Sequence, residues 1–170
     1  LPEKRIIFVP DRLMADNIRK ELANRGVDKE IIASDGTCVV HEEFTPDQVA
    51  EARRMFPGLK IVAHPECTPE VARLVDFLGS TSEMMNYVKT TDAPYYLMMT
   101  ECGLVDRLAV EDPEKRFIGG CRLCPYMKLN TLQKTLDALA DPAPGQIITL
   151  EEGLRKRAAA CIERMFELAP

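Results

Sequence analysis

The sequence predicts an α/β fold in which short parallel strands are covered by helices on both faces. One pattern occurs twice, in residues 4–26 and again from residue 59 to a helix that opens at 68–70: an apolar run, a proline, an acidic residue and a helix. Further apolar runs alternate with helical spacing along most of the chain. Strands that alternate with helices pair in parallel, and both faces of their sheets are covered.

The first predicted strand is 4–9, and helical spacing follows through Leu13, Ile18 and Leu22 up to Gly26. The second pattern begins with strand 59–63, and its helix opens at Thr68 with a proline in the first turn. Further strands are predicted at 30–33, 95–99, 116–118 and 146–148. Further helices are predicted near 46–55, 81–89, 131–140 and 150–168.

Several helix starts carry capping signals, such as Ser80 followed by Glu83 and Thr149 followed by Glu152. In parallel α/β folds, ligands bind outside the carboxyl ends of strands, where helix N-termini present free N–H groups. Segments that follow a predicted strand or precede a helix are therefore expected to share one edge. These segments are Pro10-Asp11, 38–43, 64–67, Ser80-Thr81, Thr100-Glu101 and 121–124.

Composition excludes several classes of function. The net charge of −5 comes from interspersed acids and bases, so no basic stripe for nucleic acid is expected. Apolar runs fall far short of the roughly 20 residues of a membrane span, and nothing resembles a signal peptide. The sequence thus predicts a cytoplasmic protein without a membrane partner. Six cysteines in such a chain indicate metal binding or redox chemistry more than a disulfide framework.

The chain has two histidines, and each has a carboxylate and a cysteine nearby: His41 lies between Cys38 and Glu43, and His64 precedes Glu66 and Cys67. An imidazole can polarise a carbonyl or carboxylate while a neighbouring carboxylate moves protons. Histidines that follow strands are also common as satisfied structural residues. Ser80 and Thr81 open a helix that can hold an anion, although capping alone would account for Ser80.

Cys121 and Cys124 form a Cys-x-x-Cys motif after two glycines. A four-cysteine zinc site would need a second pair at that spacing, and thioredoxin-like chemistry would need the motif after the first strand. An iron–sulfur cluster accepts widely separated thiolates, which suits Cys38 and Cys124. Cys161 is interpreted as a small apolar residue of the last helix, and the paired methionines are interpreted as residues of the hydrophobic core.

Five motifs along the chain together resemble the quinolinate synthase family. They are Asp35-Gly36-Thr37-Cys38-Val39-Val40-His41-Glu42-Glu43-Phe44-Thr45, His64-Pro65-Glu66-Cys67, Asp76-Phe77-Leu78-Gly79-Ser80-Thr81-Ser82-Glu83-Met84, Thr100-Glu101-Cys102-Gly103 and Cys124-Pro125-Tyr126-Met127-Lys128-Leu129-Asn130-Thr131-Leu132. They occur in the family's order over nearly the whole chain.

The resemblance implies an enzyme of de novo NAD biosynthesis that condenses iminoaspartate with dihydroxyacetone phosphate to quinolinate. It implies a [4Fe-4S] cluster that acts as a Lewis acid and is held by three cysteines, one from each of three pseudo-symmetric α/β/α domains. It also implies a functional link to L-aspartate oxidase or aspartate dehydrogenase, which would supply iminoaspartate.

Carried over by position, Cys38 and Cys124 match cluster ligands. The substrate-binding positions are His64, Pro65, Glu66, Ser80, Thr81, His41 and Glu43. Among them, the resemblance makes Glu66 the residue expected to transfer protons, with His64 orienting the substrate and sharing that task. Cys121 is expected to form a reversible disulfide with a neighbouring thiol, as parts of the family do.

The chain resembles the latter two-thirds of the family, without the segment that carries the third cluster cysteine. We therefore expect a partial second domain over 1–58, a third domain over 59–145, and a C-terminal helix in 146–170 that packs on the missing first domain. Such a chain should be inactive alone. The alternative is a non-catalytic metal- or redox-binding module with the same fold.

Overall fold

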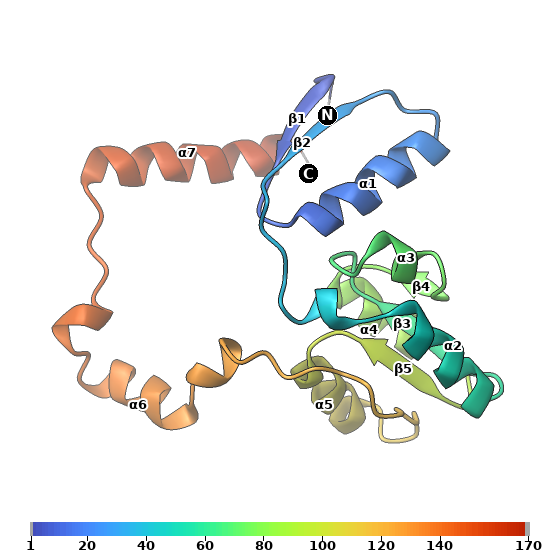
Figure 1. Cartoon of the computed structure of the whole chain (residues 1–170). Helices are drawn as coiled ribbons and strands as arrows, with labels where there is room; N and C mark the ends of the chain where they lie inside the picture. Colours follow the sequence, from blue (N-terminus) through green and yellow to red (C-terminus); the bar gives the residue numbers. More distant parts are fainter. Residues whose placement is uncertain (1, 169–170) are drawn as a thin grey trace. The chain divides into compact units, whose positions relative to one another are not determined.

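The computed structural model describes residues 2–168 (Figure 1). The chain divides into two compact units, Glu3–Pro125 and a second unit that begins at Tyr126. The first unit contains all of the strands within the described residues. Both of its sheets are parallel, which confirms the predicted α/β class.

The first sheet is formed by a single β-α-β unit. It consists of β1 (Arg5–Phe8), α1 (Arg12–Asn24) and β2 (Glu30–Ala33), and the two strands pair in parallel with Ile6 opposite Ile31. Asp11 caps α1, because its side chain accepts a hydrogen bond from the Met14 N–H. Figure 1 shows α1 alongside this two-stranded sheet.

The second sheet has three parallel strands in the order β4-β3-β5. Its elements in chain order are η1 (His41–Glu43), α2 (Pro46–Met55), β3 (Lys60–Ala63), α3 (Pro69–Ala72), β4 (Phe77–Leu78), α4 (Thr81–Thr90), β5 (Tyr96–Met99) and α5 (Cys102–Glu111). The sequence did not predict β4 or α5. β4 is only two residues long, and only Thr100 and Glu101 separate the end of β5 from the start of α5, so neither element is clearly marked in the sequence.

Successive residues of β3 point to opposite faces of this sheet. Ile61 and Ala63 pack with Val49 of α2 and Val71 of α3, whereas Val62 packs with residues of α4 and α5. All residues of β5 are buried as well. The sheet is therefore the middle layer of three, which explains why its strands read as continuous apolar runs.

Two predicted strands differ from the structure. Residues 116–118 form only an isolated parallel bridge from Phe117 to Tyr96, and a second bridge joins Arg122 to Glu101. The predicted strand at 146–148 is wrong, because Pro144–Gln146 form a short 3-10 turn, η3, and no strand follows it. The proline and glycine at the start of this segment favour a turn over an extended strand.

The second unit is helical within its described residues. It contains η2 (Met127–Leu129), α6 (Leu132–Ala140), η3 and α7 (Glu152–Leu168). None of these elements buries a residue, and Leu132 is 92% exposed. Across residues 2–168, no helix is both long enough and apolar enough to cross a bilayer.

Candidate functional site

The candidate site lies at the carboxyl ends of the three-stranded sheet. His64 follows β3, Ser80 and Thr81 follow β4, and Thr100 follows β5. Neighbouring parallel strands end at the same edge, and two backbone hydrogen bonds continue the pairing beyond the strands. These bonds run from the His64 N–H to the Met99 carbonyl (3.4 Å) and from the Gly79 N–H to the Ala63 carbonyl (3.1 Å). The predicted common edge therefore exists for these segments.

His41 is the buried centre of the site and is 7% exposed. Its Nδ1 lies 2.8 Å from Glu66 Oε2, and its Nε2 lies 3.0 Å from Thr100 Oγ1. An ionised carboxylate only accepts hydrogen bonds, so Nδ1 carries the proton and donates it. A neutral ring then accepts the Thr100 hydroxyl proton at Nε2. Thr100 and Glu66 thus hold His41 in one tautomer.

His64 stacks on His41, with ring centroids 4.5 Å apart and planes at 17°. Its Nδ1 accepts the Glu66 backbone N–H at 3.3 Å, so a neutral His64 carries its proton on Nε2. Burial lowers the pKa of His64, and the neighbouring His41 lowers it further, against the opposing charges of Glu66 and Asp11. His64 is therefore a neutral donor near pH 7.

Glu66 is the carboxylate beside the edges of the two stacked rings, 2.8 Å from His41 Nδ1 and 3.6 Å from His64 Nδ1. The hydrogen bond from His41 lowers the pKa of Glu66, and the charge interactions with His64 and His41 act in the same direction, although burial opposes them. Its side chain is 22% exposed. Glu66 is accordingly an ionised, partly accessible proton acceptor at neutral pH.

Cys38 lies beside this group. One donor atom each from Cys38, His41 and Glu66 fall within 4.8 Å of one another, a set able to hold a metal ion. Burial raises the pKa of the Cys38 thiol, while hydrogen bonds from the His41 and Val40 backbone lower it in part. A bound cation would favour the thiolate.

Cys124 packs against the same hydrophobic cluster as Cys38, and both are partly buried. The Cys124 N–H lies 3.4 Å from Glu101 Oε1. The other carboxylate oxygen of Glu101 accepts the Gly103 N–H in the first turn of α5. Cys121 is bonded to Cys102 in a disulfide, so the pairing expected for Cys121 is with the first residue of α5.

The remaining predicted site residues lie nearer to the surface. Glu43 is paired with Arg122 at 3.2 Å, which joins η1 to the segment before Cys124. Ser80 caps α4 in a capping box with Glu83, and Thr81 is the first residue of that helix. Both hydroxyl residues are exposed. Pro65 contributes its carbonyl, which accepts a hydrogen bond from Asn17.

Comparison with known families decides which family this arrangement belongs to. The family model described as Quinolinate synthetase A protein (NadA) matches residues 1–167. The chain belongs to this family. Relatives of the NadA family include Quinolinate synthase 2 of Mesorhizobium japonicum, 41% identical over 162 residues that make up 95% of this chain and 48% of the relative.

Two other NadA relatives match over almost the same span. The quinolinate synthase of Caulobacter vibrioides is 36% identical over 98% of this chain and 43% of its own length. That of Thermosynechococcus vestitus is 34% identical over 99% of this chain and 53% of its own length. The chain thus spans about half the length of the relatives it matches.

Three buried residues that support the candidate site, Asp11, Asn17 and Thr100, were not among the site residues expected from the sequence. Together with His41 they are the buried polar or charged residues of the described chain. Each was hidden by an ordinary alternative, because an Asp before a helix reads as a cap, an Asn inside a helix as surface, and a Thr after a strand as a turn. Thr100 and Asp11 did lie in segments expected at the shared edge.

Proposed function

We propose that this chain is part of a quinolinate synthase, which condenses iminoaspartate with dihydroxyacetone phosphate to quinolinate with loss of phosphate and water. The observation that carries the proposal is the ionised Glu66 at the edge of the stacked His41 and His64 rings, hydrogen-bonded to His41 and with Cys38 beside it. The reaction needs protons removed and returned next to a metal centre, and this group combines both capacities.

The donor chemistry around Cys38 fits an iron–sulfur cluster. Cys38 and Cys124 are soft thiol ligands that pack against one hydrophobic cluster, and they would hold the [4Fe-4S] group. An iron without a protein ligand supplies a Lewis acid when the cluster is bound. Two thiols are fewer than the three that the family resemblance implies, and we assign the third to the part of the relatives that this chain does not span.

Cys67 is a poor candidate for that third ligand. It is fully buried, its thiol lies 3.6 Å from the Met99 carbonyl, and burial raises its pKa to about 12. Cys102 and Cys121 are joined to each other, and Cys161 is an exposed residue of the second unit. No thiol among the described residues is thus an obvious third ligand for Cys38 and Cys124.

The side chains have separate roles in the proposed reaction. Glu66 accepts and returns the substrate proton, and the Nε2–H of His64 binds a carboxylate or carbonyl oxygen of iminoaspartate. His41 keeps Glu66 ionised and oriented. Thr81, with Ser80, offers a hydroxyl and the N-terminus of α4 to a substrate carboxylate, and Pro65 and Glu43 line the approach.

Iminoaspartate is the product of aspartate oxidation, so an L-aspartate oxidase or aspartate dehydrogenase would supply the substrate. We also propose that residues 146–170 pack on a domain that corresponds to the region of the relatives that this chain does not span. Ile162 and Met165 of α7 are 55% and 66% exposed, which leaves apolar surface for such a partner.

The rival function is a metal- or redox-binding module without catalysis. Two features favour this rival, because redox chemistry or metal binding alone would account for them. They are the Cys102–Cys121 disulfide and the donor set of Cys38, His41 and Glu66. A mononuclear zinc ion held by sulfur, nitrogen and oxygen donors would be its signature.

The test is to fuse this chain to the part of the Mesorhizobium japonicum relative that the match leaves uncovered. After anaerobic reconstitution we expect about four irons per chain, as the [4Fe-4S] formula requires, and quinolinate formation from the two substrates. Glu66→Gln should lower kcat by about 100-fold or more, and Glu70→Gln, on the exposed face of α3, should leave it unchanged.

Zinc bound with no iron and no quinolinate would support the rival and overturn the proposal. Full activity of the Glu66→Gln fusion would remove the role of Glu66 as the proton acceptor while leaving the family's reaction in place.

A further inference from the structure

We propose that Asp11, the N-cap of α1, and Asn17 within α1 are positioning residues that hold the two halves of the site together, Cys38 on one side and the turn 64–67 on the other. Both are buried polar side chains, 3% and 8% exposed, and both bond to backbone far away in the sequence. Buried polar groups must find partners, and here the partners are the backbone of the site.

Asp11 uses its two carboxylate oxygens separately. Oδ1 accepts the Met14 N–H at 2.7 Å and caps α1, whereas Oδ2 accepts the Cys38 N–H at 2.9 Å. A carboxylate can do both because each of its oxygens is an acceptor, whereas an asparagine has one carbonyl oxygen and a serine is too short to span both. The residue therefore ties the start of α1 to the main chain of Cys38.

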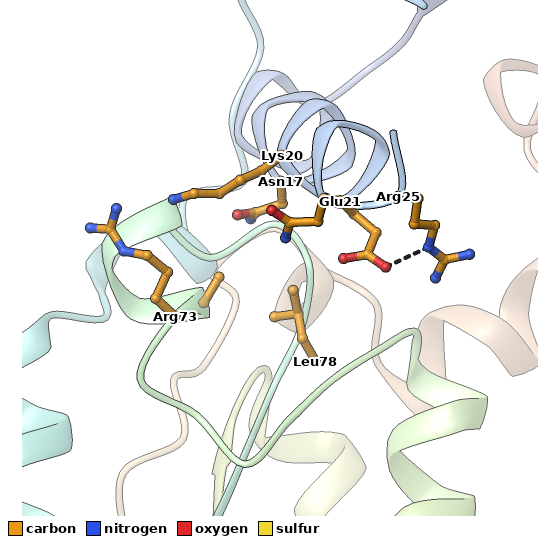
Figure 2. Close-up of a pocket in the computed structure, with 8 residues that line it drawn as sticks. Asn17, Lys20, Glu21, Arg25, Arg73 and Leu78 are labelled. Carbon is orange, nitrogen blue, oxygen red and sulfur yellow. Dashed lines mark hydrogen bonds and ion pairs between the residues drawn. The ribbon is translucent and has the colours of Figure 1, made fainter. Parts of the chain in front are cut away.

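Asn17 uses both hydrogens of its side-chain amide. Nδ2 donates to the Pro65 carbonyl at 2.7 Å and to the Cys67 carbonyl at 2.8 Å, so Glu66 is held from the residue before it and the residue after it. Figure 2 shows Asn17 on the side of α1 that faces a cavity of about 450 Å³, with Arg73 and Leu78 on the other wall.

A single helix therefore contacts both halves of the site. Asn17 lies six positions after Asp11, which is about 9 Å along a helix. Loss of either contact should free one half relative to the other and disturb the His41–Glu66 hydrogen bond that joins them. A role of these residues in catalysis depends on the function proposed above. The contacts themselves do not depend on it.

The direct test uses this chain labelled with ¹⁵N. In Asn17→Ala, amide exchange at Glu66 and Cys67 should rise by about 10-fold or more, and the His41 ring signals should move from one tautomer towards an average of two. In Asp11→Asn and Asp11→Ser, exchange should rise at Cys38, and the serine variant keeps the helix cap. Asn24→Ala and Asp16→Asn, on the same helix and without contacts to the site, are the matched controls.

Unfolding in urea separates positioning from general loss of structure, since a positioning role changes these signals in chains that remain folded. If Asn17→Ala does not fold, amide exchange at Cys38 in the Asp11→Ser chain tests the proposal instead. The proposal would be overturned if the amide of Cys38 exchanged at the parental rate in the Asp11→Ser chain. It would also be overturned if a folded Asn17→Ala chain kept the His41 tautomer of the parent.

The fusion described above gives a second measurement. Asn17→Ala should lower kcat by about 10- to 100-fold, with a smaller change in KM, because it displaces Glu66 without removing a substrate contact. A parental fusion that makes no quinolinate would reject the proposed function and leave the exchange experiment valid. An active parent with an equally active Asn17→Ala variant would reject positioning alone.

Discussion

Thr100 shows how a single buried hydroxyl can set the chemistry of a site. It is 2% exposed and directs its proton to His41 Nε2, which leaves Nδ1 to donate to Glu66. With the opposite tautomer, His41 would present a lone pair to an ionised carboxylate and repel it. The state of Glu66 therefore depends on a residue that does not itself reach the carboxylate.

Thr100→Val tests this dependence. The substitution keeps the shape but removes the donor, so a buried acceptor on His41 loses its partner, and we expect a loss of about 1–2 kcal/mol in the free energy of unfolding. Urea unfolding measures it. Thr90→Val, at an exposed position near the end of α4, is the control and should change stability much less. Equal stability of Thr100→Val and the parent chain would contradict the assigned hydrogen bond.

Glu66 should also make stability depend on pH. Because the pKa of Glu66 is lower in the folded chain than in the unfolded one, its contribution is present above the unfolded pKa and is lost as pH falls through the folded value. Glu66→Gln should cost about 1 kcal/mol near neutral pH and should flatten the acid side of the stability curve.

Urea unfolding at several pH values below about 5 measures this effect. Glu70→Gln is the control, since Glu70 is an exposed residue of the short helix α3, and its curve should follow that of the parent chain. A Glu66→Gln curve as steep as the parent's would show that other groups carry the acid dependence.

At the scale of elements, helix caps explain why many boundaries could be predicted. Thr45 and Ser80 each form a full capping box, and α2 begins and ends where the sequence predicted. Strands without such markers were harder to place. β4 takes its identity from pairing with β3, and the segment 146–148, which has a strand-like composition, has no strand to pair with.

The disulfide joins two elements that the sequence leaves far apart. Cys102 opens α5, and Cys121 lies just before the segment that carries Cys124, at a sequence separation of 19. Closing a loop of this size restricts the unfolded chain and should contribute about 3 kcal/mol to stability. Addition of dithiothreitol should lower the urea midpoint of the parent chain accordingly.

The double variant Cys102→Ser, Cys121→Ser is the control for that experiment, because its midpoint should not respond to dithiothreitol. A parent chain whose midpoint is the same with and without the reductant would argue that the bond does not form in solution.

At the scale of the whole molecule, the two units differ in how much they bury. Glu3–Pro125 contains both hydrophobic clusters of the described residues, whereas no residue of α6 or α7 is buried. Helices without a buried face gain little from tertiary packing and open easily.

Limited proteolysis of this chain should reflect that difference. Trypsin should cut first after Lys128, Lys134 or Arg155, and a product close to Glu3–Pro125 should persist at least about 10-fold longer, as followed by mass spectrometry. In the fusion with the uncovered part of the relative, the same sites should be protected. First cleavage within α2 or α4 would contradict the assignment of the stable unit.

The sequence by itself determined the α/β class, most helix starts and the residue types of the site, because periodicity, caps and paired histidine–carboxylate motifs are local features. It also determined membership in a family of known chemistry. Only the tertiary structure decided that Thr100 orients His41, that Cys121 pairs with Cys102, and that α1 supports both halves of the site. These contacts join residues distant in sequence, and a hydrogen bond or disulfide depends on where folding brings two groups, which no local pattern records.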